Sequence, residues 1–276
     1  MTTRLTVLLS LVLICSSASA REGMWQPHQL DQHKAELNRL GFKLETSNLT
    51  DLSAYPMGAV VSLGNCTASF VSPQGLVVTN HHCARGSIQF NSTPKANYLR
   101  DGFLAATQRD ELPAAPGSRV YVTEASTDVT SRVLAGIDRQ TEPRKRYQIV
   151  DDRRKAIIAE CEATEGYRCE VRTFHNGKSF FLEKKLEIRD VRLVYAPADM
   201  VGRYGGDVDN WQWPRHTGDF SFYRAYVSPE GKPADFSKDN VPYSPALHLK
   251  VEPNGVYEGD FVMVAGYPGK TQRYRL

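Results

Sequence analysis

Two cysteines and two histidines form the densest group of reactive side chains in the sequence. They lie in segment 66–83, CTASFVSPQGLVVTNHHC, which places His81 and His82 directly before Cys83. A histidine acts as a general base only when its ring nitrogen is held within about 3 Å of the proton that it takes. A disulfide closing the hairpin that this segment predicts would fix the adjacent histidine. The segment therefore predicts a rigidly placed general base.

Two other interpretations of this segment stay open. Cys66, His81, His82 and Cys83 could bind zinc, although adjacent ligands lack the C-x2-C or H-x3–5-H spacing typical of structural zinc sites. The histidines could instead be incidental to a purely structural hairpin. The catalytic interpretation requires neither a metal nor a cofactor.

A catalytic histidine also needs a carboxylate that orients its ring and stabilises the imidazolium. Segment 205–220, GGDVDNWQWPRHTGDF, contains three aspartates and two tryptophans. Asp219 comes where this loop enters an apolar run, so we expect it at the start of a strand, whereas the other two aspartates lie deeper in the glycine-rich loop. The alternative for Asp219 is an ion pair with Arg215 or Arg224.

The first twenty residues have the pattern of a secretory signal peptide. One basic residue, Arg4, precedes the apolar run 5–15, and Ala18-Ser-Ala20 has the form of a cleavage site. A run of about eleven residues is shorter than the ~20 that a spanning helix needs, and no later segment is long enough. We therefore expect residues 21–276 to be exported, into the periplasm or the medium.

The cysteines that remain after removal of the signal peptide are even in number. An even count in an exported protein favours two disulfides. Of the three connectivities, the sequence-local one pairs Cys66 with Cys83 and Cys161 with Cys169.

The composition is that of an ordinary globular protein. The 276 residues include 34 Lys+Arg and 31 Asp+Glu, for a net charge of +3, with 41% hydrophobic and 10% aromatic residues. A charge so near neutral argues against a nucleic-acid surface, and the aromatic content argues against disorder.

Hydrophobic periodicity predicts a mostly β fold with helical insertions. Three- and four-residue spacing predicts a helix over 29–40, and a charged helical segment spans about 142–165. Short apolar runs bounded by Gly and Pro predict strands, as in a barrel or sandwich. The expected strands are 60–63, 67–71, 76–79, 120–123, 170–174, 180–188, 192–196, 220–227, 246–249 and 261–265.

Six motifs together resemble the amino-terminal part of the bacterial S46 dipeptidyl peptidases, the group that contains dipeptidyl peptidases 7 and 11. They are Gly23-Met-Trp25, Pro56-Met-Gly-Ala59, Cys66-Thr-Ala-Ser-Phe70, Thr79-Asn-His-His-Cys83, the segment 206–219 and Ala265-Gly-Tyr-Pro-Gly269. The resemblance implies a chymotrypsin-like double β-barrel with a large helical domain, which removes dipeptides from peptides with a free amino terminus. It also implies that the full-length enzyme can form a homodimer.

The resemblance assigns roles to four residues of this chain. His82 corresponds to the catalytic base and Asp219 to the carboxylate that orients it. Asn210 and Trp211 correspond to the pair that holds the α-amino group of the substrate. An amide oxygen accepts from an ammonium and an indole face attracts cations, so these residue types suit that role.

The nucleophilic serine of such an enzyme has no counterpart in this sequence. It normally lies in a Gly-x-Ser-Gly-type turn, whereas Ser87, Ser118 and Ser179 have glycine on one side only. We therefore expect residues 21–276 to be the first barrel with its helical insertion, truncated before the second barrel and the large helical domain, and inactive in isolation. The alternatives are an exported peptide-binding fragment without catalysis and a chymotrypsin-like endopeptidase. The side-chain specificity at the cleaved bond is left open.

Overall fold

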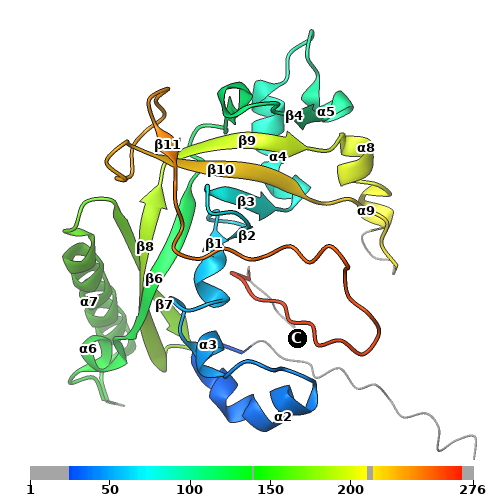
Figure 1. Cartoon of the computed structure of the whole chain (residues 1–276). Coiled ribbons are helices and arrows are strands. Elements are labelled where there is room, and N and C mark those ends of the chain that lie inside the picture. Colours follow the sequence, from blue (N-terminus) through cyan, green and yellow to red (C-terminus); the bar gives the residue numbers. More distant parts are fainter. Residues whose placement is uncertain (1–24, 139, 210–213, 269–276) are drawn as a thin grey trace, which may run out of the picture.

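A single antiparallel sheet organises the chain in the computed structural model, which describes residues 25–138, 140–209 and 214–268. Its strand order is β4-β9-β10-β3-β2-β1-β6-β8-β7, with β11 paired to β10 and β5 to β9 (Figure 1). The strands are β1 (Val60–Ser62), β2 (Thr67–Phe70), β3 (Leu76–Thr79), β4 (Phe103–Leu104), β5 (Leu112–Pro113), β6 (Val120–Asp128), β7 (Tyr167–Phe174), β8 (Ser179–Ile188), β9 (Asp190–Ala196), β10 (Ser221–Val227) and β11 (Val241–Pro242).

Most helices are short; α4 (His81–Asn91) packs against β9, and the longest helix, α7 (Pro143–Glu162), packs against β7. The others are α2 (Lys34–Arg39), α3 (Ser47–Thr50), α5 (Tyr98–Asp101), α6 (Thr130–Leu134), α8 (Asp199–Gly202) and α9 (Gly206–Asp209), with 3-10 turns at Pro27–His33, Met57–Ala59 and Gln108–Asp110. None of these helices in the described part of the chain is long and apolar enough to cross a membrane.

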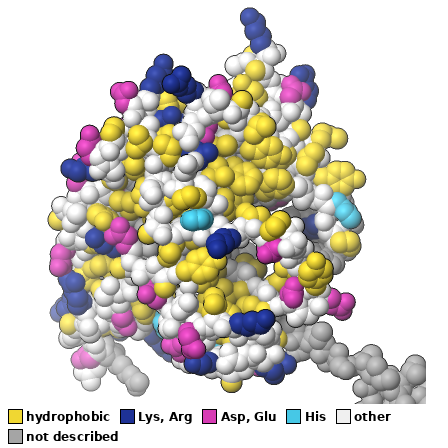
Figure 2. Space-filling model, in the orientation of Figure 1, with side chains coloured by type: hydrophobic (Ala, Val, Ile, Leu, Met, Phe, Trp, Pro, Cys, Tyr) yellow, Lys and Arg dark blue, Asp and Glu magenta, His cyan; other side chains and the backbone are white. Residues whose placement is uncertain are grey.

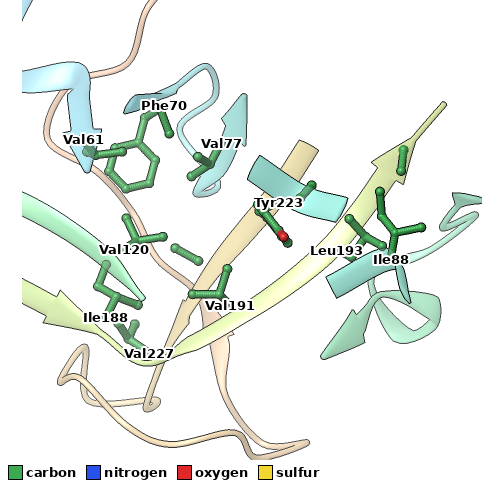
Figure 3. Packing of buried hydrophobic residues seen from close by; sticks show 14 residues of the cluster. Val61, Phe70, Val77, Ile88, Val120, Ile188, Val191, Leu193, Tyr223 and Val227 are labelled. Carbon is green, nitrogen blue, oxygen red and sulfur yellow. The ribbon is translucent and has the colours of Figure 1, made fainter. Parts of the chain in front are cut away.

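The main core lies inside the curve of the sheet. Figure 3 shows Phe70 and Val77 from β2 and β3 in the same cluster as Val120, Ile188 and Val191 from β6, β8 and β9. Strands far apart in the sheet order thus bury side chains in one place, because the sheet curls around them. The mostly β class is confirmed; among the described residues no ladder joins β4 to β7, so the hydrogen-bonded path is open.

The helical insertion expected at 142–165 is confirmed as α7. Pro143 occupies its first turn, and the Glu142 carboxylate accepts hydrogen bonds from the backbone N–H groups of Arg144 and Lys145, which caps the helix. Ile157 of α7 packs with Val171 of β7 in a second apolar cluster. This cluster holds α7 on the β7–β8 end of the sheet (Figure 1).

Three predictions of local structure differ from what the structure shows. The helix expected over 29–40 is a 3-10 turn as far as His33 and α-helical only in α2. The strands expected at 246–249 and 261–265 are wrong, because these segments are irregular. Strand propensity forms a ladder only where a partner edge exists, and Val264 is fully exposed.

The β2–β3 hairpin delivers the chain to the histidines. Its turn is closed by Val71 N–H donating to the Leu76 carbonyl at 2.9 Å, and Gly75 adopts φ +66°. A Cβ at Gly75 would lie 2.7 Å from the Tyr243 oxygen and 2.9 Å from the Ala225 oxygen. Glycine is therefore required here for both its backbone angle and its lack of a side chain.

Replacing Gly75 by alanine tests this requirement. Gly231 has a similar φ of +77°, but a Cβ there meets nothing within 4 Å, so Gly231→Ala is the matched control. We expect Gly75→Ala to lower the free energy of unfolding by about 2 kcal/mol more than the control does, because only Gly75→Ala adds a steric clash. Urea denaturation measures both; equal losses would contradict the close packing of this turn.

Candidate active site

The two histidines lie in the first turn of α4, which begins where β3 ends. Asn80, which lies between β3 and α4, has extended backbone angles, and His81 is the first residue of the helix. Successive helical residues point about 100° apart, so the two side chains diverge. His81 is fully buried, whereas 62% of the His82 side chain is exposed.

The exposed His82 meets the predicted carboxylate. Asp219 lies just before β10, and its Oδ2 is 2.8 Å from His82 Nδ1. Its Oδ1 accepts from the His82 backbone N–H at 3.0 Å, and the Asn80 amide donates to Oδ2 at 3.1 Å. Residues 137 positions apart in the sequence are thus brought together, with the carboxylate held by three donors.

Asp219 is therefore an ionised acceptor at neutral pH. Burial by itself raises the pKa of its carboxyl, but the hydrogen bonds from His82 and Asn80 outweigh burial and lower that pKa below its ordinary value. A carboxylate can only accept, so the His82 proton at this contact is on Nδ1. His82 Nε2, on the opposite side of the ring, is left as the basic nitrogen.

The ion pair proposed as an alternative for Asp219 is not formed by Arg224. The Arg224 guanidinium donates instead to Glu111 Oε1 at 2.8 Å and to the Gln74 carbonyl at 2.7 Å. Asp219 therefore pairs with His82, and Arg224 pairs with Glu111.

Both predicted disulfides are confirmed. Cys66–Cys83 joins the residue before β2 to the first turn of α4, and Cys161–Cys169 joins α7 to β7. Donor atoms of Cys66, His82 and Cys83 lie within 4.8 Å of one another, but the two sulfur atoms are bonded to each other and cannot act as thiolate ligands. The zinc interpretation of this segment is therefore wrong.

His81 has an aspartate of its own, which the sequence analysis missed. His81 Nε2 lies 2.9 Å from Asp199 Oδ1, and Ser221 Oγ lies 3.4 Å from His81 Nδ1. This serine, histidine and aspartate resemble a catalytic triad, but His81 and Ser221 are fully buried. No substrate can reach Ser221 there, so the arrangement is structural. A buried histidine requires polar partners, but no spacing pattern pointed to Asp199.

The other predicted site residues are only partly covered by the structure. Asn210 and Trp211 lie outside the described residues, directly after α9. No serine hydroxyl of the described residues hydrogen-bonds to the His82 ring. Ser87, one of the serines considered above, is buried and accepts from the Ala115 N–H at 3.0 Å.

Exposed apolar side chains border the site. Figure 2 shows hydrophobic side chains gathered over the ends of β9 and β10 beside α8. The large exposed apolar residues from α8 to the residue before β10 are Met200, Val201, Tyr204, Val208 and Phe220. Exposed apolar side chains that gather on one face are typical of contact with a ligand or another protein surface.

Removal of the Cys66–Cys83 disulfide tests its role at the site. The double variant Cys66→Ala/Cys83→Ala loses a cross-link that closes a 17-residue separation, which is worth about 3 kcal/mol of unfolding free energy. We expect Cys161→Ala/Cys169→Ala to lose a similar amount. Only the first variant should shift the low-field proton NMR signal of His82 Nδ1–H; an unshifted signal would show that the disulfide does not hold His82.

The pH dependence of stability tests the Asp219 hydrogen bonds. Because the folded-state pKa of Asp219 is lowered, its contribution is present above the ordinary value of about pH 4 and is lost as pH falls through the lowered pKa. We expect Asp219→Asn to flatten the fall in unfolding free energy as the pH drops below about 4. Urea denaturation across this pH range measures the unfolding free energy of both proteins. The same dependence on pH in wild type and Asp219→Asn would contradict the hydrogen bonds assigned to Asp219.

Known proteins similar to this chain are peptidases. The family model described as Peptidase S46 matches residues 20–276. The chain is 52% identical over 273 residues to an Asp/Glu-specific dipeptidyl-peptidase of Shewanella putrefaciens, covering 99% of this chain and 37% of the relative. It is 40% identical to dipeptidyl-peptidase 7 of Porphyromonas endodontalis, covering 97% of this chain and 33% of that relative.

A solved structure agrees with these relatives. The crystal structure of Porphyromonas endodontalis DPP11 in complex with the dipeptide Arg-Glu matches with a TM-score of 0.76 and 39% identity, over 87% of this chain and 35% of the other. The chain thus spans about a third of the length of these relatives. Since the family model matches nearly the whole sequence, the chain belongs to peptidase family S46.

Proposed function

We propose that this chain supplies the general base and its orienting carboxylate to a serine-type dipeptidyl peptidase, which releases dipeptides from the free amino termini of peptides. The observation that carries the proposal is the contact of 2.8 Å between His82 Nδ1 and Asp219 Oδ2, in a chain of family S46. The exposure of His82 supports it, because a general base must reach the substrate.

In the proposed reaction, His82 Nε2 takes the proton from a serine hydroxyl while the serine oxygen bonds to the peptide carbonyl carbon. Asp219 stabilises the imidazolium and keeps its ring in place. His82 then gives the proton to the leaving amine as the C–N bond breaks, which leaves the dipeptide bonded to the serine oxygen. A water molecule next gives a proton to His82 as its oxygen bonds to the carbonyl carbon. His82 returns that proton to the serine oxygen as the C–O bond breaks, and the dipeptide is released. No serine hydroxyl of the described residues hydrogen-bonds to the His82 ring, so we expect residues 21–276 in isolation to show no turnover.

Asn210 and Trp211 are proposed to hold the α-amino group of the substrate. Support comes from the match of segment 206–219 to the family motif and from the chemistry of an amide oxygen and an indole face toward a cation. Anchoring of the amino terminus is what separates a dipeptidyl peptidase from an endopeptidase.

An acidic residue before the cleaved bond is the proposed substrate preference. The relative with 52% identity is Asp/Glu-specific, whereas dipeptidyl-peptidase 7 is 40% identical. Export to the periplasm or the medium fits the signal-like segment 1–20 and the two disulfides, which persist in oxidising compartments. Homodimer formation by the full-length enzyme stays a prediction.

Hydrolysis of dipeptidyl fluorogenic amides by the natural full-length protein that carries this chain tests the proposal. We expect turnover of substrates with Asp or Glu in the second position, little with Phe, and none after acetylation of the amino terminus. His82→Ala and Asp219→Asn should each lower kcat by about 10⁴, and Asn210→Ala should mainly raise KM.

Each competing function gives a different result in this assay. Equal hydrolysis of acetylated substrates would indicate an endopeptidase. Peptide binding in calorimetry without turnover would indicate a binding module. Full activity of His82→Ala would contradict the assigned site.

A further inference from the structure

The buried His81 connects the three elements that meet at the candidate site. It lies in α4, its Nε2 is 2.9 Å from Asp199 Oδ1 in α8, and its Nδ1 is 3.4 Å from Ser221 Oγ in β10. The second Asp199 oxygen accepts from Arg85, one turn further along α4, at 3.3 Å. Asp199 therefore bonds α8 to α4 at two places.

Helix α8 is also bonded to the segment that carries Asp219. The Gly218 N–H donates to the Val201 carbonyl at 2.9 Å, and Thr217 Oγ1 donates to the Tyr204 carbonyl at 2.9 Å. Gly218 directly precedes Asp219 in the sequence. A shift of α8 would therefore also move the segment that leads to Asp219, through one backbone–backbone hydrogen bond and one bond from the Thr217 hydroxyl.

The packing between α8 and the first turn of α4 is close. Gly202 lies directly against the His81 ring, and a Cβ built at Gly202 would overlap the ring atoms. A Cβ at Gly218 would come within 2.9 Å of Val201 Cγ1. These two glycines allow α8 to approach the first turn of α4 and the Asp219 segment at once.

We propose that His81 and Asp199 are positioning residues that set the geometry of the His82–Asp219 pair. His81 and His82 are consecutive, so the ring of His81 anchors the backbone from which His82 projects. That backbone also donates to Asp219 Oδ1, and Ser221 ties His81 to the strand that Asp219 enters. The structural role of His81 and Asp199 does not depend on the proposed function, but their expected effect on peptidase activity does.

The two adjacent histidines should hold opposite tautomers. Burial by itself raises the pKa of the Asp199 carboxyl, but hydrogen bonds from His81 and Arg85 outweigh burial and lower that pKa, so Asp199 is a carboxylate. It accepts from His81 Nε2–H, which leaves His81 Nδ1 to accept from Ser221. His82, in contrast, carries its proton on Nδ1, toward Asp219.

Two perturbations with matched controls test the proposal in the natural full-length protein. Gly202→Ala displaces the His81 ring, and its control is Gly86→Ala in α4, where a Cβ meets nothing within 4 Å. Asp199→Asn removes a charge from the network without a change in volume. Its control is Asp190→Asn, a buried carboxylate of β9 that pairs with Arg192 and Asn240. The isosteric Asp199→Asn carries the test if Gly202→Ala does not fold.

Positioning predicts a split in the kinetic constants that loss of stability does not produce. We expect Gly202→Ala and Asp199→Asn to lower kcat between about tenfold and hundredfold, with KM changed by less than about twofold, because small displacements of catalytic groups are costly. Both control variants should keep kcat within about twofold, even where Asp190→Asn lowers the melting temperature. An unchanged kcat in folded Asp199→Asn, with His82→Ala inactive, would overturn the positioning role and leave the proposed function intact.

An NMR measurement separates the positioning role from catalysis. In wild-type protein, 15N-edited imidazole spectra should show the Nε2–H tautomer for His81 and the Nδ1–H tautomer for His82. Gly202→Ala and Asp199→Asn should shift the Nδ1–H signal of His82, and Gly86→Ala should not. An unshifted signal in both test variants would overturn the proposal whatever the activity of the protein.

Discussion

The hydrogen bond between His82 Nδ1 and Asp219 Oδ2 is the interaction on which the candidate site depends. It joins the first turn of a helix to the start of a strand 137 residues later, so neither group can hold the other without support from the fold. Two features of the fold supply this support. The Cys66–Cys83 disulfide restrains the helix, and the β3–β10 ladder places the start of β10 beside the end of β3, from which the helix begins.

Burial separates two histidines that are adjacent in the sequence. His81 and His82 each meet an aspartate, but one ring is sealed among α4, α8 and β10 and the other is open to solvent. A buried imidazole with satisfied partners stabilises one arrangement of its neighbours. An exposed imidazole with one nitrogen held is suited to exchange protons. The same residue type is thus buried among its partners at one position and open to solvent at the next.

The sequence predicted the exposed half of this site better than the buried half. The His82-Cys83 pair and the placement of Asp219 before an apolar run are local signals, and β3 has the predicted bounds. Asp199 could not be predicted, because its contact with His81 depends on how a four-residue helix packs against α4. The strand predicted around Val264 failed for a related reason, since propensity does not reveal whether a partner edge is present.

Labelling of the natural full-length protein with a fluorophosphonate tests most directly whether His82 activates a serine. The probe reacts with a serine oxygen only when a general base takes its proton. We expect mass spectrometry to find one modified serine in the wild-type protein and none in folded His82→Ala. Equal labelling of both proteins, or no labelling of the wild type, would contradict this role of His82.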